Sequence, residues 1–134
     1  MASPTNEVIT VSVPPEAGYV HVLRAVTASV AARLPIPSNG IEDLRLAVDE
    51  ACAWLLARGR SASAMTLRLR PLGDRLEAEV SIDVADGPWP PPDMEKSLPW
   101  RILSALVDSL SVDADGMGPS IRLTKRTLEP SRTT

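Results

Sequence analysis

The stretch EDLRLAVDEACAWLLA, residues 42–57, decides the fold of this 134-residue chain. Apolar residues recur in it every three or four positions, which is the period of a helix with one buried face. This apolar stripe consists of Ile41, Leu44, Val48, Ala51 and Leu55. Acidic Glu42 and Asp43 near its start and Arg58 at its end suit the helix dipole, and Gly59 closes it. The pattern predicts a helix of about 41–57.

Periodic segments lie on both sides of this helix, with proline and glycine between them. Alternation of apolar and polar residues indicates strands, and a three-to-four-residue period indicates helices. The pattern predicts, in order, a strand at 8–13, helices at 16–34 and 41–57, strands at 65–70 and 76–84, a helix at 97–110 and a strand at 120–126. This order is typical of an α/β (α+β) fold, a two-layer sandwich with a mixed, mostly antiparallel sheet and three helices on one face.

Two of the predicted strands form a hairpin around Gly73 and Asp74. One strand carries arginines on its polar face and the other carries glutamates. Antiparallel pairing would set these opposite charges across from each other, which favours this register.

Length and composition limit the molecule to one domain, 1–134, with an ordered core of about 7–127 and a polar tail at 128–134. Apolar residues make up 44% and charged residues 23% of the chain, as in globular proteins. We expect no membrane segment and no secretory signal. The one cysteine, Cys52, cannot form an internal disulfide and is expected to be a small buried apolar residue. These features predict a cytoplasmic protein.

Charge argues against two classes of function. Fourteen basic and seventeen acidic residues give a net charge of −3, whereas nucleic-acid binders usually show a basic excess on one face. With one histidine, His21, and one cysteine, the chain lacks the usual zinc ligands, so no metal site is predicted. Direct nucleic-acid binding is not expected either.

The run DLRLAVDEAC, residues 43–52, together with the order of elements, resembles the bacterial anti-sigma regulatory factors, the switch-protein serine kinases. These belong to the superfamily of histidine-kinase-like ATPases. The resemblance covers most of the chain, from the first strand to IRLTKR, and implies the ATPase fold of that superfamily.

The resemblance also implies roles for residues of the central helix. Glu50 stands where the family has the glutamate thought to act as the catalytic base. Four residues later the family has an asparagine that binds magnesium, and here that position holds Trp54. An indole has no oxygen to offer a hard cation, so magnesium cannot be held there in the usual way. Glu50 could equally be a solvated helix residue, and Trp54 could fill the space left by a lost nucleotide.

The family's two glycine boxes are also altered in this chain. In VADGPWPPPD, Asp86 takes the place of the adenine-reading aspartate, and Gly87 follows it, but prolines and Trp89 replace what comes next. Asp86 and Gly87 also read as an ordinary turn. In SLPWRILSALVD, residues 97–108, Ser97 and Pro99 stand where glycines expose N–H groups to phosphate, and proline has no N–H.

Three altered elements predict a domain that kept its fold and lost most of its nucleotide site. The family resemblance then implies an anti-sigma factor that sequesters an alternative RNA polymerase sigma factor, works as a homodimer and is countered by an anti-anti-sigma partner of the STAS type. Arg24 aligns with an arginine that contacts sigma in the family.

The alternative is an active ATP-dependent serine/threonine kinase that uses Glu50. No cofactor is expected in the first case, and ATP with magnesium in the second. Regulation of something other than transcription is a third possibility.

Overall fold

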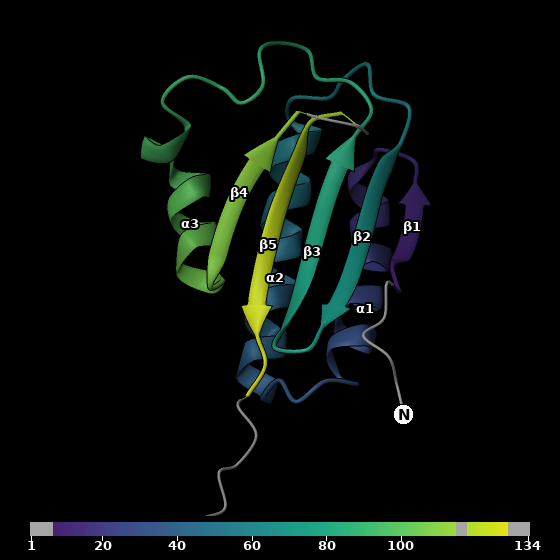
Figure 1. Cartoon of the computed structure of the whole chain (residues 1–134). Helices are drawn as coiled ribbons and strands as arrows, with labels where there is room; N and C mark the ends of the chain where they lie inside the picture. The colour runs from purple at the N-terminus through teal and green to yellow at the C-terminus, as the bar shows by residue number, and fades with distance from the viewer. Residues whose placement is uncertain (1–6, 115–117, 129–134) are drawn as a thin grey trace, which may run out of the picture.

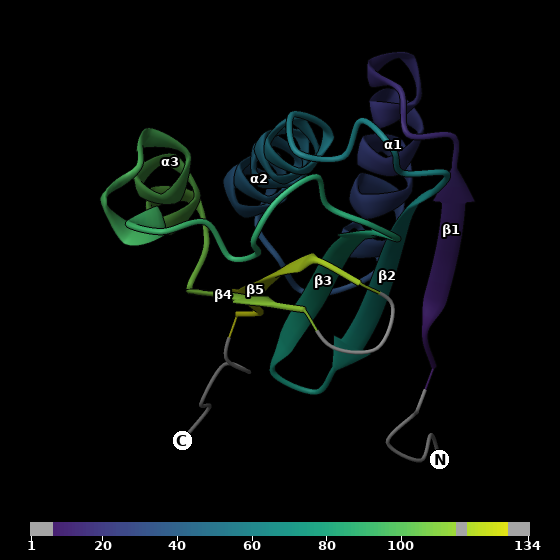
Figure 2. The same cartoon turned by 90° about the horizontal axis from the view of Figure 1, so that it is seen from above.

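The computed structural model describes residues 7–114 and 118–128, which form a five-stranded sheet and a row of helices over one of its faces (Figures 1 and 2). The elements are β1 Ile9–Val13, the 3-10 turn η1 Ala17–Tyr19, α1 Val20–Ala31, α2 Ser38–Leu56, β2 Met65–Leu72, β3 Arg75–Ile82, the 3-10 turn η2 Met94–Lys96, α3 Leu98–Leu106, β4 Ser109–Asp113 and β5 Ser120–Arg126. The two-layer fold predicted from the sequence is confirmed.

The strands run in the order β1-β2-β3-β5-β4, and the four pairings between them are all antiparallel. The predicted hairpin is present in the expected register, with Arg68 opposite Glu79 and Arg70 opposite Glu77. The first strand lies at one edge of the sheet and pairs only with β2 among the described strands. The sheet is thus antiparallel throughout the described pairings, where the sequence allowed a mixed one.

The last predicted helix, 97–110, runs too far, because the structure ends it at Leu106 and starts the strand β4, which was not predicted, at Ser109. The helix α3 ends at Leu106, and Val107 already has an extended backbone. Leu110 and Val112 then alternate with exposed serines and pair with Leu123 and Ile121 of β5. The apolar residues of this segment fit a helical period and a strand period equally well, and pairing with β5 selects the strand.

The helix α2 starts three residues earlier than predicted, at Ser38. Gly40 lies inside its first turn and is buried. A Cβ there would stand 3.0 Å from the Cγ2 atom of Ile36, which is a tight contact. Ser38-Asn39-Gly40, which lies before the predicted helix, is therefore helical, since the absent side chain at Gly40 lets Ile36 pack closely. The C-terminal end of α2 lies at the same end of the sheet as the C-terminal end of β3 (Figure 1).

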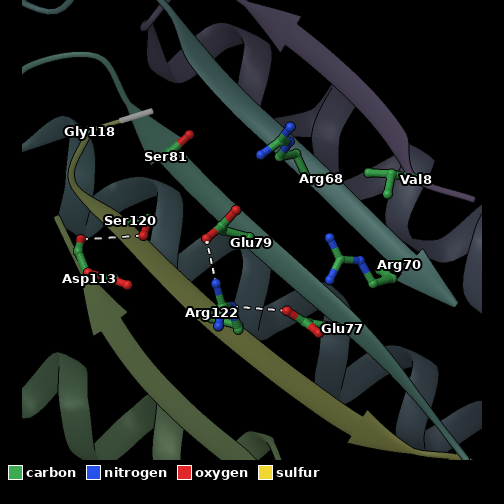
Figure 3. A pocket seen from close by; sticks show the side chains of 10 residues that line it. All are labelled: Val8, Arg68, Arg70, Glu77, Glu79, Ser81, Asp113, Gly118, Ser120 and Arg122. Atoms are coloured by element: carbon green, nitrogen blue, oxygen red, sulfur yellow. Dashed lines mark hydrogen bonds and ion pairs between the residues drawn. The ribbon is translucent and has the colours of Figure 1, made fainter. Parts of the chain in front are cut away.

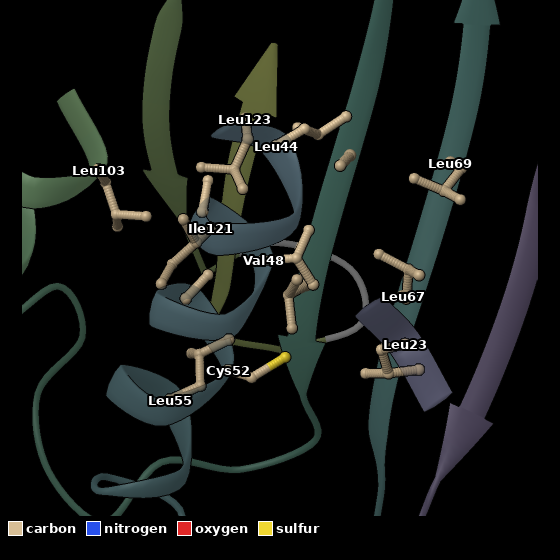
Figure 4. Packing of buried hydrophobic residues seen from close by; sticks show 14 of the residues in the cluster. Leu23, Leu44, Val48, Cys52, Leu55, Leu67, Leu69, Leu103, Ile121 and Leu123 are labelled. Carbon is tan, nitrogen blue, oxygen red and sulfur yellow. The ribbon is translucent and has the colours of Figure 1, made fainter. Parts of the chain in front are cut away.

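The core lies between the inner face of the sheet and the three helices (Figure 4). The predicted stripe of α2 supplies Leu44, Val48, Ala51 and Leu55, all fully buried. Leucines of β2 and β5 face them from the sheet, and Leu23 and Leu103 contribute from the neighbouring helices. Within residues 7–114 and 118–128 we find no helix that is both long and apolar enough to cross a bilayer.

One glycine is fixed by close packing between strands. Gly118 has φ +111°, and a Cβ there would come within 2.4 Å of the carbonyl oxygen of Ile82. The backbone of the β4–β5 connection can therefore approach the end of β3 only with glycine at this position.

Candidate functional site

The residues singled out in the sequence come together around the second half of α2 and the segment 83–97 between β3 and α3. Figure 1 shows this segment crossing the end of the molecule at which α2 finishes. Glu50 and Trp54 lie one turn apart on α2, as their spacing requires. The segment contributes Trp89 and leads to Ser97 at the start of α3.

Trp54 is a packed core residue whose ring meets a second indole. Its exposed fraction is 7%, and its ring centroid lies 5.8 Å from that of Trp89, with the two planes at 60°. This is an edge-to-face pair, a favourable arrangement for aromatic rings. The position at which the resemblance expects a magnesium-binding asparagine is therefore filled by an apolar ring that packs against the next segment.

Trp89 also ties its proline-rich segment to the sheet. Its Nε1–H donates a hydrogen bond of 3.0 Å to the carbonyl oxygen of Asp113, at the end of β4. The Trp89–Pro90 peptide bond is cis, and Pro91 and Met94 further along the segment are buried. The segment is thus anchored to α2 through its ring and to β4 through its N–H, at the place where the family resemblance expects a glycine-rich lid.

The carboxylate of Asp86 is engaged by the loop that follows α2. It accepts hydrogen bonds from the backbone N–H of Arg60 at 2.8 Å and from the N–H and hydroxyl of Ser61 at 3.3 and 2.8 Å. The Arg60 N–H, followed by the Ser61 hydroxyl, lowers the pKa of Asp86. Adenine recognition by Asp86 stays a prediction, and these bonds to the loop compete with it. Gly87 has open space where a Cβ would stand, so it forms no close approach in this structure.

The first turn of α3 has few N–H groups left for a phosphate. Pro99 has none, and the N–H groups of Trp100 and Arg101 donate to the hydroxyl and the carbonyl oxygen of Ser97. Ser97 acts as the N-cap, and its hydroxyl in turn donates to the carbonyl oxygen of Met94 at 2.6 Å. Among the described residues the exposed Leu98 N–H has no acceptor, whereas the N–H groups of Trp100 and Arg101 are satisfied within the helix start, as in an ordinary capped helix.

Glu50 and Arg24 lie on adjacent helices, but each has a different environment. Glu50 is half-buried, and its carboxylate makes no hydrogen bond or ion pair with any described residue. The side chain of Arg24 is 37% exposed and pairs with Asp49 across the α1–α2 contact at 2.8 Å. Sequence reasoning missed the role of Asp49. Its adjacency to Glu50 in the family-like run was the available signal.

Two smaller predictions concern cysteine and metals. Cys52 is fully buried, and burial, followed by the charge of Asp49, raises the pKa of its thiol to about 12. It is a buried apolar residue, as predicted. Among the described residues, no group of three or more histidine, cysteine, aspartate and glutamate side chains is placed to hold a metal ion.

Taken together, these residues do not fit magnesium-ATP. The magnesium position holds the buried Trp54 ring, and the Asp86 oxygens accept bonds from the loop after α2. In the first turn of α3, Pro99 has no N–H, and the N–H groups of Trp100 and Arg101 are already used. A hard cation needs oxygen ligands, and a phosphate needs N–H donors that are not already used. We therefore derive no catalytic step through a nucleotide.

Comparison with known proteins agrees with the fold. The family described as the histidine kinase-like ATPase domain matches residues 13–125. The chain is 29% identical over 126 residues to the anti-sigma-F factor RsbW of Mycobacterium tuberculosis, covering 80% of this chain and 72% of that protein. It is 27% identical over 142 residues to the serine-protein kinase RsbW of Bacillus velezensis, covering 92% and 88%.

A solved structure shows the same fold. The chain superposes with a TM-score of 0.72 and 16% identity on the crystal structure of the RsbU and RsbW domains of Rv1364c from Mycobacterium tuberculosis. The match covers 96% of this chain and 35% of that longer one. With the sheet order, the helix row and a family match that spans most of its length, this chain belongs to the histidine kinase-like ATPase domain family.

Proposed function

We propose that this chain is an anti-sigma factor that acts by binding, sequestering an RNA polymerase sigma factor without phosphorylating a partner. One relative is named an anti-sigma-F factor, which supports sigma binding, and another is named a serine-protein kinase, which supports the alternative of phosphorylation. The observation that carries the proposal is the Trp54–Trp89 pair, which fills the place where the kinase reading needs a magnesium ligand.

Release of sigma then depends on competition. An anti-anti-sigma partner of the STAS type that binds an overlapping face would displace sigma by affinity and concentration. Such a switch works only through differential binding to two states, and it needs no covalent step. A sigma factor acts inside the cell, so the proposal includes a cytoplasmic location.

The proposed contact with sigma is centred on Arg24. Truncation of a charged anchor at an interface commonly costs a few kcal/mol, so Arg24→Ala should weaken sigma binding by at least about tenfold. Its half-exposed ion pair with Asp49 contributes only about 0.2–1 kcal/mol to folding, so the variant should still fold. Arg75→Ala, on the β2–β3 hairpin, is the matched control.

The experiment begins with a pull-down of the tagged chain from its own cytoplasm, with mass spectrometry of what is retained. Recovery of a sigma factor supports the proposal, and titration of that sigma factor with the two variants then tests Arg24. Equal affinity of Arg24→Ala and the unmodified chain would remove Arg24 from the interface. Recovery of only a small phosphorylated partner would favour the kinase.

The proposal includes a homodimer. Support comes from the family resemblance and from β1, an edge strand with a free hydrogen-bonding side among the described residues. Sedimentation at micromolar concentration should give a mass near twice 14.4 kDa. A species of one chain would contradict the dimer without affecting sigma binding.

One observation favours the alternative, an ATP-dependent serine/threonine kinase. Glu50 is half-buried and has no partner among the described residues, as a general base must be available to its substrate. Calorimetry with ATP, with and without magnesium, separates the two functions. Micromolar binding that requires magnesium would establish the kinase reading. Trp54→Asn should not create such binding, because Pro99 and the Ser97 cap still withhold the phosphate donors.

A further inference from the structure

The outer face of the sheet, away from the helices, carries a hollow of about 220 Å³ (Figure 3). Three arginines and two glutamates from three neighbouring strands line most of it. They are Arg68 and Arg70 of β2, Glu77 and Glu79 of β3, and Arg122 of β5. The polar side chains of the alternating strands meet here because their apolar partners all face the core.

Both glutamates form ion pairs with the same arginine, Arg122. Arg122 Nε donates to Glu77 at 3.0 Å, and its Nη2 donates to Glu79 at 3.2 Å, so one positive charge is shared by two negative charges between β3 and β5 (Figure 3). The register would equally allow each glutamate to meet the arginine opposite it on β2. Neither glutamate forms an ion pair with an arginine of β2, so the side chains of Arg68 and Arg70 remain without a carboxylate partner among the described residues.

The side chains of Arg68 and Arg70 make no hydrogen bond or ion pair with residues 7–114 or 118–128. Arg68 is half-buried, and its Nε is a buried donor without an acceptor. A buried donor left unpaired costs folding free energy that an acceptor would recover. The third acid of the hollow, Asp113, lies at its far end on β4, next to Ser120 (Figure 3). The positive side of the hollow is therefore β2.

The spacing of these two arginines suits one small oxyanion. Residues two apart on a strand lie about 7 Å apart on the same face, and each guanidinium is a fixed fork of donors that matches phosphate oxygens. On the β1 side, the small Thr10 lies opposite Arg68. Val8, just before β1, lines the hollow beside Arg70 and is itself exposed, so it borders the pair on that side (Figure 3). We propose that the hollow binds a phosphate group between Arg68 and Arg70.

This site is independent of the sigma and nucleotide questions, because it lies on the face of the sheet opposite to Arg24, Glu50 and Trp54. The same chemistry is offered by free inorganic phosphate and by a phosphorylated side chain. The two sources are separated by titrating the folded full chain with inorganic phosphate and with phosphoserine, at fixed ionic strength because salt screens exposed charges.

Nuclear magnetic resonance titration of the arginine Nε–H signals gives the affinity and places the site. Wild-type chain should show saturable shifts of the Arg68 signal. Arg70→Gln, at an exposed position, should weaken binding by about tenfold, and Arg68→Gln by at least as much. Glu79→Gln frees part of Arg122 and should tighten binding. Far-UV circular dichroism checks that each variant is folded.

Arg101→Gln is the control, since Arg101 is an exposed arginine of α3 on the helical side. It removes the same charge and should leave the affinity unchanged. Equal weakening by Arg101→Gln and Arg70→Gln would overturn the proposal by showing diffuse attraction alone. Absence of saturable shifts with both probes up to about 20 mM, a concentration at which even millimolar sites fill, would also overturn it. Tighter binding of phosphoserine than of phosphate would identify a phosphorylated side chain as the source.

Discussion

Replacing Trp54 with alanine should destabilise the domain strongly, because its buried ring packs between α2 and the proline-rich segment and holds the two together; we call this ring the wedge. A tryptophan buries up to about 250 Å², which at about 25 cal/mol per Å² gives about 6 kcal/mol. Compact unfolded chains reduce such figures by about 10–40%, which leaves about 4–5 kcal/mol for a residue only 7% exposed. This agrees with the range of about 3–5 kcal/mol found for Trp→Ala changes in cores.

Urea unfolding followed by far-UV circular dichroism measures this loss without relying on tryptophan emission. A double-mutant cycle with Trp89→Ala isolates the edge-to-face pair, for which we expect a coupling of about 0.5–1.5 kcal/mol. Trp100→Ala, at a half-buried indole outside the pair, serves as the control. A loss below about 1 kcal/mol for Trp54→Ala, or additivity of the Trp54 and Trp89 losses, would refute the wedge.

Three further predictions concern acid stability, thiol chemistry and backbone strain. A hydrogen bond from the Ser63 hydroxyl lowers the pKa of Asp83, and one from the Arg60 N–H lowers the pKa of Asp86. Both carboxylates therefore stabilise the fold above the ordinary aspartate pKa of about 3.9. This stabilisation is lost as the pH falls through the lowered pKa values of the folded state. Urea unfolding from pH 6 to 2 should therefore show a flatter acid limb in the Asp86→Asn variant, and an unchanged limb would contradict the assignment. Cys52, with a pKa of about 12, has about one thiolate in 10⁴ at pH 8 and should resist Ellman's reagent until the chain unfolds. Gly118→Ala should cost about 1–3 kcal/mol or more in thermal unfolding, whereas Gly87→Ala, with open space at its Cβ, should change stability by less than about 0.5 kcal/mol; equal effects would rule out the close contact with Ile82.

Local alternation predicted most of the sheet correctly. The β2–β3 hairpin and its register follow from residues close in sequence, since apolar and charged positions alternate on both sides of Gly73 and Asp74. The core stripe of α2 was readable for the same reason, because every residue of a helix face is set by its spacing.

Features that depend on distant partners could not be read in this way. Leu110 and Val112 form a strand only because Leu123 and Ile121 lie beside them, and no local period distinguishes this from the end of a helix. The same holds for the site. The Asp49 partner of Arg24 is 25 residues away in the sequence, so the pair becomes visible only when the two helices pack.

The open edge of β1 has a consequence for how the cell must handle this protein. Natural sheets usually blunt a free edge with lysine, proline or a bulge, but Ile9–Val13 contains neither lysine nor proline. A chain produced in excess of whatever covers this edge would present unpaired backbone groups beside apolar side chains, a template for further strands. Matched production of the chain and its binding partners would then protect against aggregation, and an orphan copy would be a substrate for quality-control proteolysis.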